Sequence, residues 1–200
     1  MEELNAGTHQ LSARDTQLGD RVLVDTEPQT VTVGEDGTAN PAKLIFRFEL
    51  SFMQFPNMGG AIIKEGSFPV YAGPGTTYHS FESAAVPGGT EVFTYGTDNG
   101  WAIIAYGVNG GWRLGYVSID ALAYPGDLNT WSSAAMVTLT DATLRSNHID
   151  SNNTQDDIPL PAGSPATVLA QVKDTALLYI ETIIGETPVR GFIDKSALGL

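Results

Sequence analysis

The chain has 200 residues, of which 42% are hydrophobic and 16% charged, enough apolar sequence for one medium-sized domain or two to three small ones. Ten basic against 23 acidic residues give a net charge of −13, which disfavours nucleic acid and anionic membrane surfaces as partners. There is no cysteine, which excludes disulfides, thiol nucleophiles and thiolate metal sites.

The first 60 residues are predicted to form a small N-terminal β segment. Residues 1–20 are polar and aperiodic and are expected to be a loose, partly disordered lead, with no visible signal peptide. Short β-branched runs follow at 21–26 and 30–39, and apolar and polar residues alternate in 43–52. This pattern predicts a β-hairpin or a short antiparallel sheet.

From residue 61 to the C-terminus the sequence is predicted to consist of strands and turns. The nearest approach to a helix is a single turn at 118–122 and another at 194–198. No apolar run approaches the roughly 20 residues that a membrane-spanning helix needs, so membrane insertion is not expected. We therefore predict an all-β fold. The expected strands are 91–95, 101–106, 112–118, 166–171, 176–182 and 188–193.

An internal repeat connects the two halves of this region. Shifted by 76 positions, residues 98–122 align with 174–198 without a gap. The glycine-aromatic-aliphatic segment 115–117 then falls on 191–193, and both copies end in Ala-Leu. This shared order of turn, strand, turn and closing strand indicates a duplicated structural unit.

The repeat predicts two tandem small barrels, at 61–124 and 132–200, after the N-terminal segment 1–60. The turn-rich linker at 124–133 is expected to mark the boundary between them. At about 65 residues each, the copies are near the lower size limit for independent folding, so we expect them to pack together.

The segment FPVYAGPGTTYHSF at 68–81 raises the question of a phosphate-binding loop. A P-loop requires G-x-x-x-x-G-K-[ST] before a helix. Here Gly73 and Gly75 are two residues apart, no lysine follows, and a strand is expected next. Two interpretations stay open: a long loop shaped by its glycines and proline, or a loop that also forms one wall of a groove, faced by Tyr71 and Tyr78.

Residues 68–122 carry a family resemblance. The opening VYAGPGTTY, the GT-x-V strand, the GW that begins the next strand and the closing R-x-GYV together resemble a bacterial SH3-like domain. The second copy resembles this family more distantly, since it keeps VRGFI but lacks the GPGT loop and both tryptophans. The resemblance implies small five- or six-stranded barrels of bacterial surface proteins, which serve as targeting or binding modules, and an extracellular or cell-envelope location.

No constellation for catalysis or tight metal binding is recognisable. His9, His79 and His148 are scattered, and none lies in a zinc or nucleophile motif. Residues 150–157 place oxygen-bearing side chains at alternate positions, as in a calcium loop, but lack its glycine at the sixth position and glutamate at the twelfth. We predict no enzymatic activity, no cofactor and no metal site for this chain.

Aromatic side chains of the first copy carry the functional signal. At three of these positions the second copy has no aromatic residue: Trp101 corresponds to Leu177, Tyr106 to Thr182 and Trp112 to Pro188. Rigid rings beside loops suit a stacking or proline-binding groove, although the same rings could close the barrel ends or fill the contact between the copies. The predicted ligand-binding residues are Tyr71, Tyr78, Trp101, Tyr106 and Trp112.

The leading hypothesis is a non-catalytic binding or targeting module of an exported bacterial protein. Its expected partner is a cell-wall component such as peptidoglycan, or another extracellular peptide or glycan. The alternatives are a structural spacer without a ligand of its own, and a non-catalytic fragment of a cell-wall hydrolase. The ligand, the role of residues 1–60 and the oligomeric state stay open at this point.

Overall fold

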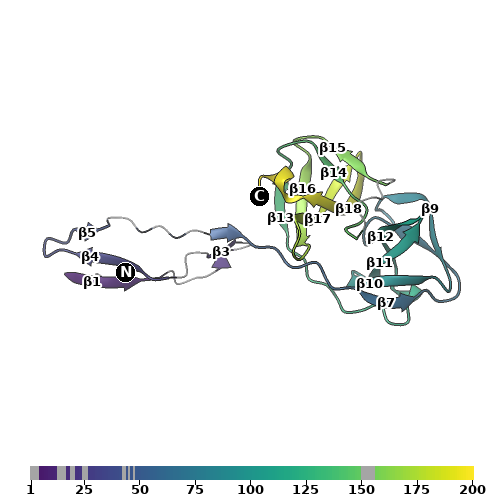
Figure 1. Cartoon of the computed structure of the whole chain (residues 1–200), viewed down its shortest axis with the longest axis horizontal. Helices are drawn as coiled ribbons and strands as arrows, with labels where there is room; N and C mark the ends of the chain where they lie inside the picture. The colour runs from purple at the N-terminus through teal and green to yellow at the C-terminus, as the bar shows by residue number, and fades with distance from the viewer. Residues whose placement is uncertain are drawn as a thin grey trace. The chain divides into compact units, whose positions relative to one another are not determined.

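The protein is described from a computed structural model, and the chain divides into two compact units, residues 1–51 and 52–200 (Figure 1). Apart from two single 3-10 turns, the described secondary structure is entirely strand, which confirms the all-β prediction. No helix formed by the described residues is long and apolar enough to cross a membrane. The structure describes residues 5–12, 17–18, 21–23, 27–41, 44, 46, 48–149 and 156–200.

Parts of four predicted segments lie outside the described residues. These are residues 1–4, 13–16 and 19–20 of the lead, the end of the first β-branched run at 24–26, three positions of the alternating run 43–52, and most of the calcium-like loop at 150–155.

The first unit contains two three-stranded antiparallel sheets, with strand orders β1-β4-β5 and β2-β3-β6. Within the lead that was expected to be loose or partly ordered, β1 is an ordered strand that pairs with β4 along its whole length. Polar side chains support this pairing, because Gln10 Nε2 donates to Thr30 Oγ1 at 2.8 Å and the Thr8 and Thr32 hydroxyls lie 3.4 Å apart. The strands are β1 (Gly7–Leu11), β2 (Gln17–Leu18), β3 (Arg21–Leu23), β4 (Gln29–Val33), β5 (Ala39–Asn40) and β6 (Phe48–Leu50).

The second unit contains both copies of the repeat, and the first copy forms a six-stranded sheet of order β7-β10-β11-β12-β8-β9. Its two central hairpins turn at Asn99-Gly100 and Asn109-Gly110, where all four residues have φ between 48° and 84°. This is the backbone that two-residue hairpin turns require, and Asn-Gly adopts it readily. The strands are β7 (Gly59–Ile62), β8 (Ser67–Tyr71), β9 (Ser80–Pro87), β10 (Glu91–Asp98), β11 (Trp101–Val108) and β12 (Gly111–Ser118), before the 3-10 turn η1 (Ile119–Ala121).

The second copy repeats this arrangement with the 76-residue offset in its central strands and its final turn. Its sheet has the order β13-β16-β17-β18, and a separate β14-β15 pair is joined to β18 by a bridge between Arg145 and Phe192. The elements are β13 (Ala134–Val137), β14 (Ala142–Leu144), β15 (Ile158–Leu160), β16 (Pro165–Gln171), β17 (Leu177–Ile184), β18 (Thr187–Asp194) and η2 (Lys195–Leu198).

The repeated glycine of the closing strand has a steric cause. A Cβ atom on Gly115 would lie 2.3 Å from Val70 Cγ1, and one on Gly191 would lie 2.7 Å from the Arg145 carbonyl oxygen. In each copy a second strand therefore crosses the closing strand too closely for any side chain at this position.

Neither copy closes into a barrel in the part of the chain that the structure describes, which differs from the barrels expected from sequence. In the first copy the ladder runs from β7 to β9 without the two edges pairing, and in the second the β14-β15 pair is a sheet of its own. The two copies do pack together, through a shared core that includes Leu114 and Tyr116 from one and Tyr179 and Phe192 from the other.

Residues just before the predicted start of the first copy at residue 61 contribute to this core. Phe55 is 6% exposed, and its ring centroid lies 5.3 Å from that of Tyr95, 4.9 Å from Tyr179 and 5.2 Å from Phe192. The Phe55 backbone also donates to the Gln171 carbonyl at 2.8 Å. The segment around Phe55, which precedes β7, is therefore packed against both copies.

Candidate functional site

The two copies meet in a pseudo-symmetric way. The backbone N–H of Leu114 donates to the carbonyl of Ser146 at 2.9 Å, and that of Arg190 donates to the carbonyl of Ala72 at 2.8 Å. Leu114 and Arg190 are equivalent under the 76-residue offset, so each copy presents the same strand position to a loop of the other. This reciprocity is the geometry of an isologous interface within a single chain.

A buried ion-pair network lies across this interface, centred on the Arg190 guanidinium. Nη1 donates to Asp98 Oδ2 at 2.5 Å and to the Tyr116 hydroxyl at 3.0 Å, while Nε donates to Glu181 Oε2 at 2.8 Å. The Tyr116 hydroxyl lies 2.8 Å from that of Tyr179, and both tyrosines are completely buried. Burial raises the pKa of both hydroxyls, which favours their neutral form.

Two further side chains complete the network. The Tyr78 hydroxyl donates to Glu181 Oε2 at 2.7 Å, and Trp131 Nε1 donates to Asp98 Oδ2 at 2.8 Å. Burial, together with the hydrogen bond to Glu181, raises the pKa of Tyr78 to about 12. Because every carboxylate here is paired and the Arg190 side chain is only 8% exposed, the network holds the copies together and offers little to a ligand.

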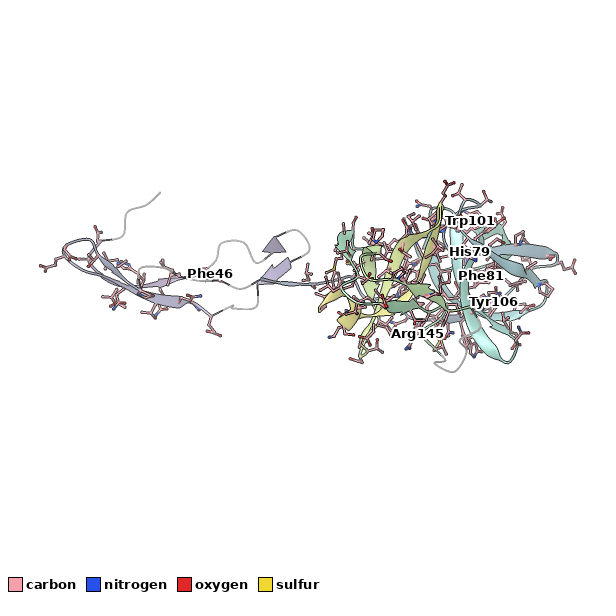
Figure 2. The ribbon with its side chains drawn as sticks, turned by 90° about the horizontal axis from the view of Figure 1, so that it is seen from above. Phe46, His79, Phe81, Trp101, Tyr106 and Arg145 are labelled. Atoms are coloured by element: carbon pink, nitrogen blue, oxygen red, sulfur yellow. The ribbon has the colours of Figure 1, made fainter. Side chains whose placement is uncertain are left out.

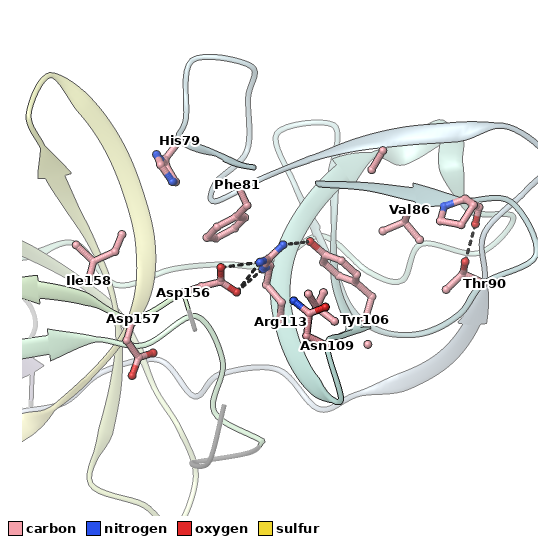
Figure 3. A pocket seen from close by; sticks show the side chains of 14 residues that line it. His79, Phe81, Val86, Thr90, Tyr106, Asn109, Arg113, Asp156, Asp157 and Ile158 are labelled. Atoms are coloured by element: carbon pink, nitrogen blue, oxygen red, sulfur yellow. Dashed lines mark hydrogen bonds and ion pairs between the residues drawn. The ribbon is translucent and has the colours of Figure 1, made fainter. Parts of the chain in front are cut away.

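An open cleft lies beside the interface, with a volume of about 890 Å³ (Figure 3). Both copies line it. The first copy contributes β9, the loop before β9 and the β11-β12 hairpin, and the second contributes residues 156–158, where β15 begins. The lining side chains include His79, Phe81, Tyr106, Asn109 and Arg113 of the first copy and Asp156, Asp157 and Ile158 of the second.

Arg113 forms the charged centre of the cleft (Figure 3). Its guanidinium donates to both carboxylate oxygens of Asp156, from Nε at 2.7 Å and from Nη2 at 2.6 Å, and from Nη1 to the Tyr106 hydroxyl at 3.2 Å. It also lies over the Phe81 ring, 4.5 Å from the centroid. A bidentate carboxylate and an aromatic face fix the planar group in one orientation.

Asp157 adds an unsatisfied acceptor to the lining. Its Oδ1 is buried and has no hydrogen-bond partner among the described residues. Burial raises the pKa of this carboxyl, and the positive charge of Arg145 opposes the rise. A buried acceptor without a partner is uncommon in native proteins.

The five aromatic residues predicted from sequence do not share one groove. Only Tyr106 is among the residues that line the cleft, and Tyr78 belongs to the Arg190 network. Tyr71 and Trp101 form an edge-to-face pair with centroids 5.5 Å apart. Trp112 lies against Phe93 at 5.0 Å, beside a separate recess. Figure 2 marks Trp101 and Tyr106 among the side chains of this unit.

Sequence reasoning misses the charged residues of the cleft. The repeat favours a purely structural role for Arg113 in the closing strand, and Asp156 reads as part of a polar loop. The sequence does contain one indication of a difference between the two arginines. Under the 76-residue offset Arg113 corresponds to residue 189 and not to Arg190, so the two arginines lie on opposite faces of equivalent strands.

The described histidines do not assemble into a catalytic or metal site. His79 lines the cleft with its ring centroid 5.5 Å from that of Phe81, whereas His148 lies in the aromatic core 4.9 Å from Phe192. Burial lowers the pKa of His148, which favours the neutral ring. Among the described residues, no three His, Cys, Asp or Glu side chains are grouped so that they could hold a metal ion.

Comparisons with known proteins add little to this geometry. No family model matches the chain, and no curated protein matches it. Among solved structures, NlpC2 from Trichomonas vaginalis is similar with 17% sequence identity and a TM-score of 0.27, over 72% of this chain and 48% of that one. The chain therefore spans about half the length of that structure, and a similarity this weak carries no argument about function.

Proposed function

We propose that this protein is a non-catalytic binding module that holds an extracellular peptide or glycan, such as a segment of peptidoglycan, in the cleft between its two copies. The observation that carries this proposal is the composition of the cleft. About 890 Å³ of open space is bordered by aromatic rings, an arginine-carboxylate pair and an amide, contributed by both copies. Such a mixture of apolar surface and a few fixed polar groups is typical of ligand sites.

The chemistry of the lining favours a neutral, hydrogen-bonding ligand. The Phe81 and Tyr106 rings line the cleft but are only 7% and 5% exposed, so a sugar ring or a peptide plane can pack only against the small part of each ring that reaches the cleft. The Asn109 side-chain amide also lines the cleft, and an amide can hydrogen-bond to the N–H, carbonyl and hydroxyl groups of a peptide or a sugar. A polyanion is disfavoured because the chain carries a net charge of −13.

Co-sedimentation with insoluble peptidoglycan tests the proposal. Ala85 is exposed and lines the cleft, so Ala85→Trp fills the cleft without removing any core packing. The matched control is Ala135→Trp, which changes an exposed alanine of β13 that does not line the cleft. We expect wild type and Ala135→Trp to pellet with the cell wall, and Ala85→Trp to remain soluble. Equal pelleting of both variants would contradict the location of the site.

The interface itself favours a second candidate function, a structural spacer. Arg190 is bonded to partners from both copies, and the shared core fixes their mutual orientation. A rigid tandem of this kind can hold neighbouring domains apart without a ligand of its own. A spacer predicts that wild-type protein does not pellet with cell walls of several types at low or at high salt, whereas the binding module predicts pelleting with at least one of them.

A further inference from the structure

A smaller recess lies at the β7 edge of the first sheet and does not belong to the cleft. Its volume is about 400 Å³. Three strands line it: β7 through residues 60–62, β10 through residues 91–93 and β12 through Trp112. None of these residues lines the cleft, so an inference about this recess does not depend on the proposed function.

The register of β7 and β10 explains why a recess exists here. Glu91 lies opposite Ile62, and Phe93 lies opposite Gly60. Since side chains alternate along a strand, these four residues share one face of the sheet. A Cβ atom on Gly60 would meet no atom within 4 Å, so this glycine leaves open space beside the Phe93 ring.

The walls of the recess combine two aromatic rings, an aliphatic side chain and a single carboxylate. The Phe93 and Trp112 centroids are 5.0 Å apart with the ring planes inclined by 40°, and Ile62 is 60% exposed. Glu91 is exposed and is the one charged residue of the lining. Ion pairs between the described residues engage Arg113 and Arg190 but not Glu91.

We propose that this recess binds an alkylammonium group, the side chain of a lysine-type residue in a partner peptide. The aliphatic stem would pack against Ile62 and Phe93, as long cationic side chains pack on apolar surfaces. The ammonium would lie between the Glu91 carboxylate and the aromatic faces, both of which attract a cation. The net charge of −13 draws cationic partners to the protein and repels anionic ones.

Titration with small peptides tests this proposal directly. The probe is the acetylated and amidated tripeptide Ala-Lys-Ala, and the readout is the amide and indole chemical shifts of the 15N-labelled full chain. The same peptide with Nε-acetyl-lysine keeps the stem and removes the charge. The acetylated peptide loses one exposed ion pair and one cation–π contact, which should weaken its binding by roughly fivefold relative to the lysine peptide.

Three variants locate the site. Gly60→Val fills the open space and is compatible with a strand, and Glu91→Gln removes the charge at constant shape; both should weaken binding of the lysine peptide by roughly fivefold or more. Gly59→Ala is the matched control, since its Cβ would make an ordinary 3.8 Å contact with Thr94 on the opposite face. It should leave the affinity unchanged.

Two outcomes would overturn the proposal. If the lysine and acetyl-lysine peptides shift the same resonances with equal affinity, the recess is a site for apolar groups and the ammonium plays no part. If neither Gly60→Val nor Glu91→Gln changes the shifts of the Trp112 indole on titration, or if no shifts occur at all, the recess does not bind this group.

Discussion

Replacing Arg190 by methionine should destabilise the second unit far more than the same replacement of the exposed Arg145. Methionine keeps most of the aliphatic volume but leaves two carboxylates without their cation. Asp98 is the more severe case, because its side chain is only 7% exposed and, among the described residues, would keep a single side-chain hydrogen bond, from Trp131. The Tyr116 hydroxyl, which is completely buried, also loses a donor.

The expected magnitude follows from the burial of the pair. Removing one partner of a buried ion pair leaves an uncompensated charge and costs about 3–5 kcal/mol. Single domains are stable by about 5–15 kcal/mol, so the variant would retain a fraction of the original free energy of unfolding. At roughly 2–4 °C for each kcal/mol, the melting temperature should fall by roughly 6–20 °C. Urea denaturation followed by tryptophan fluorescence measures the difference.

Two comparisons separate this mechanism from a loss of packing. Arg145→Met should alter stability by less than about 0.5 kcal/mol, as expected for an exposed side chain. Adding Asp98→Asn to Arg190→Met removes the stranded charge and should recover part of the loss, giving a coupling energy above about 1 kcal/mol. Arg190→Met with a loss below about 1 kcal/mol, or a double variant whose losses simply add, would refute the reasoning.

Two more predictions concern sterics and pH. Gly115→Ala should reduce the free energy of unfolding in urea by about 1–3 kcal/mol or more, because its Cβ would lie 2.3 Å from Val70 Cγ1. Gly60→Ala, which has open space around its Cβ, should be close to neutral. Equal losses for both variants would argue against the close strand crossing. Burial raises the pKa of Tyr95 to about 12, above its unfolded value near 10. The native state therefore keeps a proton that the unfolded chain releases, and stability should be unaffected by this group below pH 10 and fall as pH rises from about 10 to 12. Tyr95→Phe should make that fall shallower in urea unfolding measured from pH 9 to pH 11, and an unchanged slope would exclude this group as a cause.

The parts of the fold that were predictable from sequence depend on local interactions. The 76-residue offset correctly relates β11 to β17 and β12 to β18, because strand alternation and turn residues act over a few positions. The single turns at 118–122 and 194–198 are also present, and each begins with a capping side chain: Ser118 accepts from the backbone of residue 120, and Asp194 from that of residue 196.

The candidate site depends on contacts that sequence patterns do not encode. Arg113 meets Asp156 across 43 positions and Arg190 meets Asp98 across 92, and both pairings depend on how the two copies dock. Period-two alternation indicates which face a side chain occupies, but not which segment will cover that face. The polar ladder of β1 escapes prediction for a similar reason, since its partner strand begins 18 residues after β1 ends.

The two copies have diverged into different roles, and the positions that differ show how. The equivalents of Tyr106 and Arg113 in the second copy are Thr182 and Val189, so the second copy lacks the aromatic and charged centre of the cleft. Conversely, the equivalent of Arg190 in the first copy is Leu114, which packs in the shared core. The second copy thus supplies the cation that fixes the interface, and through Asp156 it also supplies the carboxylate that orients Arg113. The binding module proposed above therefore predicts one ligand site per chain, in the cleft, and not two.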